Sequence, residues 1–249
     1  MSIIIKSPEE VALMRQAGKI VAMVLKALEE SVKPGIRTSE LDDVCVMELA
    51  KHNVKSTFKG YKGYPAHLCV SVNNEVVHGI PGDRILTEGD IVSLDVGTSY
   101  KGFQGDAAIT VGVGEISLEA KRLLEVTQGS LLAGIAKAVH GSHLGDISAT
   151  IQRYVEERGY SVVREYTGHG IGREMHEDPP IPNFGIHGGG PLLKEGMTLA
   201  IEPMVNIGGW PTRVEKDGWK VVTADGSLSA HFEHTIVITK AEPEILTAM

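Results

Sequence analysis

Cysteine and long apolar runs are scarce in this sequence of 249 residues. The two cysteines, Cys45 and Cys69, are too few for a disulfide framework and form no CxxC motif for zinc or thioredoxin-like chemistry. The apolar run at residues 3–5 is too short for the core of a signal peptide. No stretch approaches the roughly 18 apolar residues of a membrane span. We therefore expect a cytoplasmic protein in a reducing compartment, without membrane contact.

Basic charge is also in short supply. The sequence has 24 lysines and arginines against 32 aspartates and glutamates, and its basic residues are scattered. Nucleic-acid binding relies on clustered positive charge, so we expect no nucleic-acid partner. The length suits one large core, and no linker or change in composition divides the chain. A single domain over residues 1–249 is the prediction.

Helical periodicity marks four segments. Residues Ser7–Glu10 combine an N-cap serine, a first-turn proline and a capping-box glutamate, and apolar residues then recur at helical spacing until Leu28. A second helix is expected over about 38–51, with Thr38 as its N-cap. Two more are expected over about 118–139 and 144–158.

Strand signals lie between and after these helices. Residues 69–72 and 75–78 flank Asn73-Asn74 and predict a hairpin, and a second hairpin is expected around Lys101-Gly102. A stretch rich in glycine, histidine and proline over 168–191 is expected to be a loop. Further strands are expected at 162–163, 198–202, 219–223 and 230–238. This order indicates an α+β fold, with helices covering one face of a mainly antiparallel sheet.

Four acidic residues stand in or directly after apolar strand segments: Asp95, Asp106, Glu202 and Glu233. Burying a carboxylate is costly unless it is paired or bound to a metal. One such acid is commonly satisfied by a salt bridge, but these four have only Arg84, Arg213 and Lys220 as nearby basic candidates. Two of the acids follow the first helices and two follow the second, which hints at duplicated halves with a site between them.

Mutual repulsion would raise the pKa values of these acids unless cations lie among them. With His169, in the glycine-rich segment 168–172, they form a set of oxygen donors plus one imidazole. Two divalent ions would satisfy this set, which suits cobalt, manganese, iron or zinc and does not choose among them. Paired metals deprotonate a bridging water near neutral pH and polarise a carbonyl. These are the two effects that an aminopeptidase uses to hydrolyse a peptide bond.

Two further histidines, His78 and His176, are candidates for a functional role. A lone histidine near a strand end is more often structural, so that alternative stays open for both. The seven-residue spacing from His169 to His176 excludes the HExxH motif of thermolysin-like zinc proteases. No serine stands in a GxSxG elbow, and the glycine-rich segments match neither a P-loop nor a GxGxxG fingerprint.

Seven stretches together make the chain resemble the type I methionine aminopeptidases of bacteria over essentially its whole length. They are Tyr61–Pro65, Asn74–Pro81, Leu94–Gly97, Gly105–Ala107, Gly168–Arg173 with His176-Glu177, Thr198–Pro203 and Phe232–Thr235. The resemblance implies a pita-bread fold, with pseudo-twofold halves and two metals at its centre. It implies removal of the initiator methionine from nascent polypeptides, with a small residue preferred in second place.

Carried over residue by residue, the resemblance assigns Asp95 as the chelator of one metal, His169 and Glu202 as ligands of the other, and Asp106 and Glu233 as bridges. His78 and His176 are expected to contact the substrate, and Glu202 to assist proton transfer. The walls of the methionine pocket are expected to be Tyr61, Tyr64, Cys69, Phe184 and Trp219. A monomer that contacts the ribosome transiently is a further expectation.

The sequence departs from many relatives at Gly97 and Ala107, where threonine is common. Neither change removes a ligand, but both touch the surroundings of the metals and bear on metal preference. Only 31 positions separate Glu202 from Glu233, too few for the helical insertion of type II enzymes. We also expect no N-terminal extension, because the sequence begins directly at the first helix.

Two alternative functions remain open. An X-prolyl peptidase of the same fold would usually carry an extra N-terminal domain, and only about 60 residues precede the strand region here. A non-enzymatic relative would generally have lost metal ligands, whereas all five are present.

Overall fold

Four α-helices and one 3-10 turn make up the helical part of residues 2–248, the part of the chain that the computed structural model describes. They are α1 (Pro8–Ser31), α2 (Thr38–Lys51), α3 (Leu118–Ile135), α4 (Leu144–Glu156) and the turn η1 (Tyr61–Gly63). The four predicted helices are confirmed. The last two end a few residues earlier than the periodicity indicated.

The starts of the first two helices are fixed by different contacts. At α1, the Ser7 hydroxyl accepts from the Glu10 amide and the Glu10 carboxylate accepts from the Ser7 amide, so the predicted capping box is confirmed. At α2, the predicted cap at Thr38 is wrong. The N-cap is Arg37, whose amide donates to Glu40, while the Thr38 hydroxyl bonds to the backbone of Gly82.

Nine strands form one large antiparallel sheet. Seven follow the order β1-β4-β5-β14-β9-β7-β8, while β2 pairs with β4 and β15 with β14. Their bounds are β1 (Lys55–Ser56), β2 (Cys69–Val72), β4 (Ile91–Tyr100), β5 (Phe103–Gly112), β7 (Thr167–Gly170), β8 (Glu177–Pro182), β9 (Thr198–Ile201), β14 (Glu233–Val237) and β15 (Glu244–Ile245). The predicted β4–β5 hairpin is confirmed, with Tyr100 opposite Phe103.

Two small sheets, each of three strands, flank the large one. The first has the order β13 (Ser229–His231), β10 (Met204–Asn206) and β6 (Ser161–Val162). The second has the order β11 (Thr212–Val214), β12 (Val221–Thr223) and β3 (Glu75–Val77). The predicted hairpin at 69–78 is therefore wrong, because β2 and β3 follow one another around a turn but pair into different sheets.

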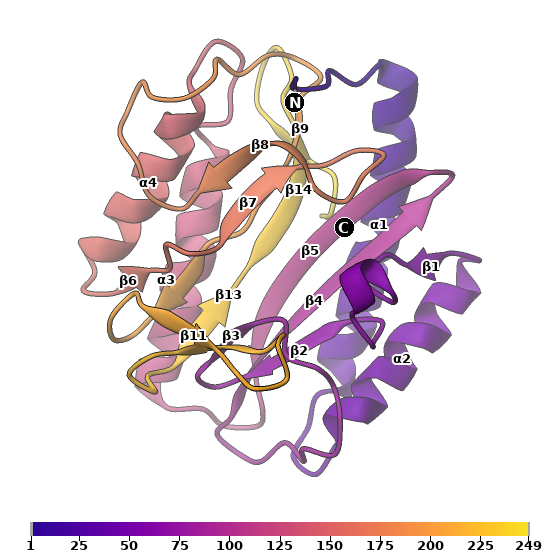
Figure 1. Ribbon diagram of the computed structural model, residues 1–249, viewed down its shortest axis with the longest axis vertical. Helices are drawn as coiled ribbons and strands as arrows, with labels where there is room; N and C mark the ends of the chain where they lie inside the picture. Colours follow the sequence, from indigo (N-terminus) through magenta and orange to yellow (C-terminus); the bar gives the residue numbers. More distant parts are fainter. Residues whose placement is uncertain (1, 249) are drawn as a thin grey trace.

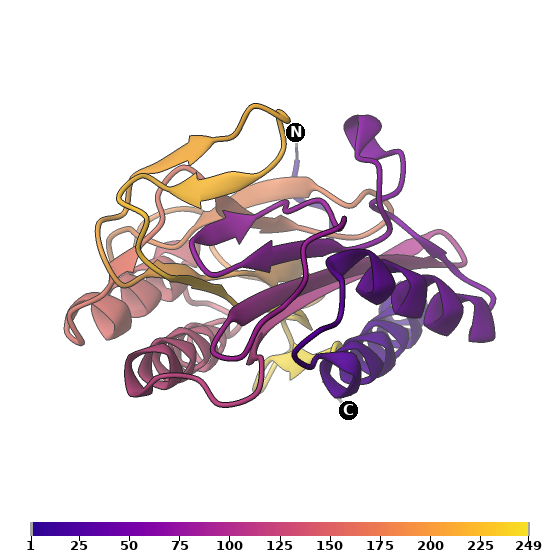
Figure 2. The same ribbon diagram turned by 90° about the horizontal axis from the view of Figure 1, so that it is seen from below.

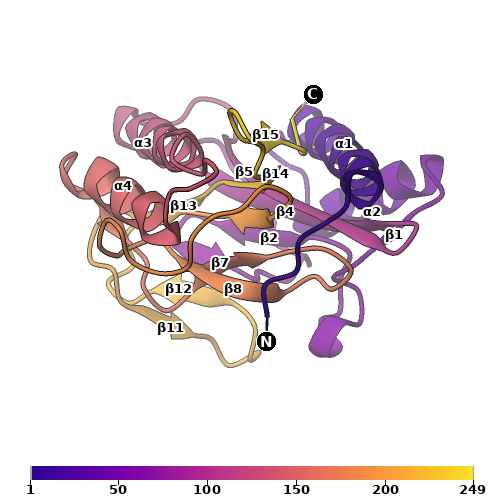
Figure 3. The same cartoon turned by 90° about the horizontal axis from the view of Figure 1, so that it is seen from above.

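All four helices lie on one face of the large sheet, as pairs under its two halves (Figures 1, 2 and 3). The pair α1–α2 shares one hydrophobic cluster with β4, and the pair α3–α4 shares another with β9 and β14. Ile109 on β5 packs against both clusters. Each fully buried leucine or isoleucine in these layers contributes roughly 1.5–3 kcal/mol. The predicted α+β class and the pseudo-twofold halves of the pita-bread fold are confirmed.

Helix α1 packs tightly against β5 at Gly105, one residue before Asp106. A Cβ atom at Gly105 would lie 2.8 Å from the Gly18 nitrogen, closer than real contacts allow. Only glycine therefore lets the helix backbone reach the strand here, and this close packing fixes the strand that carries Asp106.

Candidate metal centre and active site

Strand register brings three of the predicted ligands to one face of the sheet. Asp95 on β4 lies opposite Ala108 on β5, Gly97 lies opposite Asp106, and Glu233 on β14 lies opposite Ala108. Alternate residues of a strand share a face, and so do residues directly opposite one another. The side chains of Asp95, Asp106 and Glu233 thus project together from three neighbouring strands.

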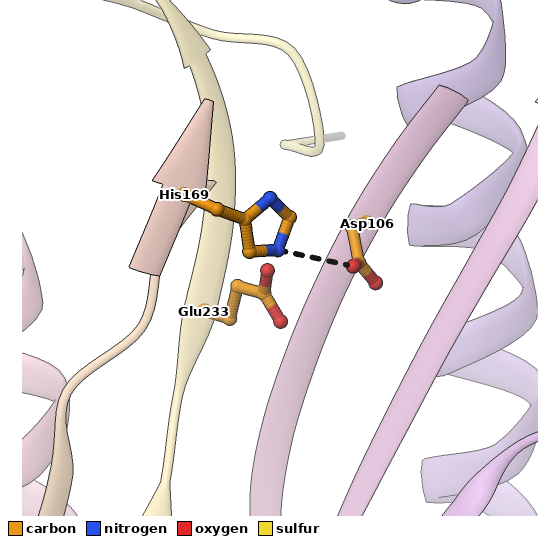
Figure 4. Close-up of side chains that lie close together, drawn as sticks. All are labelled: Asp106, His169 and Glu233. Atoms are coloured by element: carbon orange, nitrogen blue, oxygen red, sulfur yellow. Dashed lines mark ion pairs between the residues drawn. The ribbon is translucent and has the colours of Figure 1, made fainter. Parts of the chain in front are cut away.

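The other two predicted ligands come from β7 and from the end of β9. His169 lies opposite Ala200, and Glu202 follows the last residue of β9. Nε2 of His169 lies 3.6 Å from Oε1 of Glu202 and 3.9 Å from Oδ2 of Asp106. Figure 4 shows His169, Asp106 and Glu233 pointing toward one another from three strands. One ligand atom from each of these three lies within 4.8 Å of the others.

The carboxylates are poorly satisfied by the protein itself. Asp106 and Glu233 are buried, whereas Asp95 and Glu202 retain a little exposure. One oxygen each of Asp95, Asp106 and Glu233 is buried without a hydrogen-bond partner. Leaving a buried polar atom unpaired costs roughly 1–3 kcal/mol, and more when it is charged. The cluster therefore needs protons or cations among its oxygens.

The basic residues that the sequence offered as partners lie elsewhere. Arg84 and Lys220 both pair with Glu75, and Arg213 pairs with Glu215. Within residues 2–248, no lysine or arginine forms an ion pair with any of the four carboxylates of the cluster. The salt-bridge explanation for these acids is therefore wrong.

Burial raises the pKa of every carboxyl in the cluster. The pKa of Asp95 is raised to about 7 by loss of hydration, against a smaller lowering by a hydrogen bond with Asp106. Loss of hydration, and then the charges of neighbouring acids, raise the pKa values of Asp106, Glu202 and Glu233 well above their usual range. Without cations, these shifts favour the protonated form of the acids.

His169 presents a free ring nitrogen to the cluster. Its Nδ1 lies 2.9 Å from the Gly170 carbonyl oxygen and donates to it, which leaves the lone pair of Nε2 facing the acids. Burial lowers the pKa of His169 to about 3, so the ring is neutral. Unpaired carboxylate oxygens around a neutral imidazole form a donor set that fits divalent metal ions.

A cavity of about 200 Å³ opens onto these ligands. Its wall brings together all the predicted site residues but one, namely Tyr61, Tyr64, Cys69, His78, Asp95, Asp106, His169, His176, Glu202, Trp219 and Glu233. It also includes Phe58, Lys62 and Met175, which sequence reasoning missed. The predicted ligands thus lie at a pocket walled by aromatic and sulfur-containing side chains.

His78 and His176 lie at this cavity on separate supports. His78 follows β3 with a left-handed φ of 60° and contacts the rings of Trp219 and Tyr166 edge to face. The Nδ1 atom of His176 lies 2.8 Å from the Tyr61 hydroxyl. Burial lowers the pKa of both histidines, that of His78 to about 4. Both are therefore placed to exchange hydrogen bonds with a bound molecule.

Comparison with known proteins decides the family. The family model described as metallopeptidase family M24 matches residues 12–240. The chain belongs to metallopeptidase family M24. It is 54% identical to a methionine aminopeptidase of Clostridium perfringens, with 98% of each chain covered.

Two solved structures resemble the chain to different degrees. A methionine aminopeptidase of Thermotoga maritima superposes with a TM-score of 0.98 and 49% identity, over the whole of both chains. A Xaa-Pro dipeptidase of Bacillus anthracis has a TM-score of 0.79 and 24% identity, and the match covers 98% of this chain and 62% of that one. The second likeness shows the fold alone.

Phe184 is the one predicted wall residue that the structure does not place at the cavity. Its half-buried ring lies 5.4 Å from the guanidinium of Arg164 and lines a separate depression with Pro179 and Pro180. Met175, directly before His176, lines the cavity instead. The expectation for Phe184 was wrong. Its aromatic side chain would suit the wall of a methionine pocket, but its place in the chain puts it at a different depression. Adjacency to His176 was the available signal for Met175.

The departure from many family members at Gly97 has a structural counterpart. A Cβ atom there would lie 2.4 Å from the Thr57 hydroxyl, 2.8 Å from the Phe58 ring and 2.9 Å from the terminal methyl of Met175. The volume of a side chain at this position is therefore already filled by three neighbours, two of which line the cavity. The side chains of Phe58 and Met175 can occupy their present positions because residue 97 has no side chain.

Proposed function

We propose that this M24 metallopeptidase is a methionine aminopeptidase that removes the initiator methionine from the N-termini of nascent polypeptides. The observation that carries the proposal is the cluster of four carboxylates and His169, which has no lysine or arginine partner within residues 2–248 and lies at a pocket walled by aromatic and sulfur-containing groups. The full-length similarity to proteins of that name supports it.

Two divalent metal ions are proposed as cofactors, drawn from cobalt, manganese, iron and zinc. Asp95 would hold one ion, His169 and Glu202 the other, and Asp106 and Glu233 would bridge them. Bound metals would supply an acidified water and polarise the scissile carbonyl. The unpaired oxygens of Asp95, Asp106 and Glu233 are the structural support for this assignment.

Three side chains of the protein are proposed to handle proton transfer and substrate binding. Glu202, with a pKa raised by burial, would accept the proton of the attacking water. His78, neutral at pH 7, would hydrogen-bond the peptide group at the scissile bond and help the leaving nitrogen. His176, supported by the hydroxyl of Tyr61, would make the second polar contact to the substrate.

The pocket suits a methionine side chain. A thioether is flexible and polarisable, and it packs well against aromatic rings and sulfur. Here Tyr64 and Trp219 meet edge to face at 5.1 Å, and the buried Cys69 adjoins them. Burying such a side chain contributes roughly 1.5–3 kcal/mol, which favours methionine over alanine by about tenfold to a hundredfold.

We further propose a cytoplasmic monomer that contacts the ribosome transiently. Across residues 2–248, no helix has the length and apolarity needed to cross a membrane. The proposed substrate, a nascent N-terminus, accounts for the expected ribosome contact.

An X-prolyl peptidase is the competing function, since such enzymes share the fold. The test is to strip the protein with a chelator, add manganese or cobalt, and compare Met-Ala-Ser with X-Pro dipeptides. We expect free methionine from Met-Ala-Ser and no cleavage of X-Pro. Faster cleavage of X-Pro would overturn the proposal in favour of the competitor.

A further inference from the structure

A buried histidine outside the five donors adjoins two of the carboxylates. Nε2 of His231 lies 3.8 Å from Oε2 of Glu202 and 4.0 Å from Oε2 of Glu233. The side chain is 2% exposed, and Nε2 has no hydrogen-bond partner within 3.5 Å. Buried polar groups normally have hydrogen-bond partners, so a buried ring nitrogen that faces two carboxylates and has no other partner is expected to interact with them.

The backbone around this histidine is held on both sides by one hydroxyl. The Thr110 hydroxyl accepts from the His231 amide at 2.9 Å and donates to the His231 carbonyl at 2.7 Å. Thr110 lies on β5, the strand that carries Asp106, and also bonds to Ser93 on β4. The imidazole is therefore anchored to the same strands that position the proposed metal ligands.

The two carboxylates determine which ring nitrogen of His231 carries the hydrogen. A neutral imidazole carries one N–H group, and a lone pair directed at two carboxylates would repel them. The favourable tautomer places the hydrogen on Nε2, where it faces both acids. Glu202 then lies between two imidazoles, with Oε1 facing His169 and Oε2 facing His231.

Resting on the function proposed above, we propose that His231 is a positioning residue whose Nε2–H group orients the carboxylates of Glu202 and Glu233 for metal binding and proton transfer. His231 is not a wall residue of the cavity, nor one of the three residues whose ligand atoms converge. It therefore acts through the two acids and does not bind the metals itself. Outer partners of this kind typically change metal affinity or activity by about 10–100-fold.

Three substitutions separate this role from simple packing. His231→Gln keeps an N–H donor at about the reach of Nε2, and His231→Phe keeps the shape without a donor. His231→Asn keeps an amide that is too short to reach the acids. His234→Phe is the matched control, because His234 is a neighbouring histidine that bonds instead to the Thr247 hydroxyl. Each variant is stripped with a chelator, titrated with manganese by calorimetry, melted without metal, and assayed on Met-Ala-Ser.

We expect His231→Phe to bind the same number of manganese ions as the wild type, about 10–100-fold more weakly, with a comparable fall in kcat. His231→Gln should stay within about threefold of the wild type in both quantities, as should His234→Phe. If His231→Phe does not fold, His231→Asn is compared with His231→Gln instead. Only the glutamine amide reaches the two acids, so only His231→Asn should lose manganese affinity and kcat.

Three results would overturn the inference. One is wild-type manganese affinity in His231→Phe and His231→Asn. Another is the loss of one bound ion at saturation, which would make His231 a ligand. The third is an equal loss of manganese affinity and kcat in His231→Gln and His231→Phe, with matching losses of melting temperature. That result would show that His231 contributes only packing. A wild-type protein that binds no metal or leaves Met-Ala-Ser intact would instead defeat the proposed function.

Discussion

The Tyr61 hydroxyl lies 2.8 Å from Nδ1 of His176, and the two rings stack with 5.3 Å between their centroids. The bond fixes the ring, so that Nε2 is the nitrogen left for a substrate. Tyr61→Phe removes the bond and keeps the stacking. A hydrogen bond of this kind contributes about 0.5–1.5 kcal/mol, so kcat/KM on Met-Ala-Ser should fall by about twofold to tenfold.

Tyr100→Phe is the control for that variant, because Tyr100 lies at the β4–β5 turn, outside the cavity. Its kinetics should match the wild type. If Tyr61→Phe also matches the wild type, the contact to Nδ1 has no part in orienting His176.

His78 provides a test that separates metal binding from chemistry. Its φ of 60° favours asparagine over alanine as a substitute, since asparagine tolerates the left-handed region. His78→Asn and His78→Ala should both keep the two metals, yet lose about 10²–10⁴-fold in kcat with a smaller change in KM, because a positioned acid–base group is gone. Metal content, melting temperature and kcat are measured on the same samples.

Loss of metal together with the side chain would make His78 a ligand and the count of five donors wrong. A lower melting temperature with nearly intact kcat would mark it as structural. In the second case His176 becomes the better candidate for the polar contact.

The helices and the β4–β5 hairpin were predictable because their signals are local. The capping box at Ser7 and the apolar periodicity that follows it decide α1 without reference to the rest of the chain. The clustered acids could be singled out from the sequence because a carboxylate in an apolar strand requires a partner or a bound ion.

Long-range pairing was not predictable in the same way. All of β8 and all but the first residue of β7 lie in the segment 168–191, which was expected to be a loop. The two strands owe their conformation to pairing with each other and to the pairing of β7 with β9. The strand expected at 230–238 is two strands that part at Phe232 and join different sheets. The contacts of His231 with Glu202 and Glu233 depend on this three-dimensional arrangement, which is why the sequence did not single it out.

The stability of the metal-free protein should fall from pH 7 to pH 8. Folded Asp106, Glu202 and Glu233 have raised pKa values, so the folded state binds more protons than the unfolded state. Stability then falls with rising pH, by about 1.4 kcal/mol per pH unit for each carboxyl that stays protonated. The buried histidines have lowered pKa values and add stability as pH rises to about 6.5, mostly below this window.

Urea unfolding at pH 7.0, 7.5 and 8.0 in the presence of a chelator measures this slope. Asp106→Asn should make this slope shallower, because it removes one carboxyl with a raised pKa. Saturating manganese should abolish or reverse the slope, because metals bind the ionised acids. A metal-free wild type with pH-independent stability in this window would contradict the assignment of raised pKa values.

Specificity at the second residue gives a separate prediction. The cavity of about 200 Å³ has room for one methionine side chain, and Lys62 and His176 lie at its exposed edge. A bulky second residue would meet that edge, so Met-Ala peptides should be cleaved faster than Met-Trp peptides by tenfold or more, in line with roughly 1–3 kcal/mol per misfitting group. Free methionine is quantified under identical metal loading. Equal rates would refute the preference.

Calorimetric titration of chelator-stripped protein with manganese under anaerobic conditions tests the central claim most directly. The wild type should bind two ions, and His169→Ala should keep one site near wild-type affinity while the other weakens by tenfold or more, because a single-site imidazole serves one ion and the bridging acids serve both. Unchanged stoichiometry and affinities in His169→Ala, or no binding by the wild type, would contradict the account.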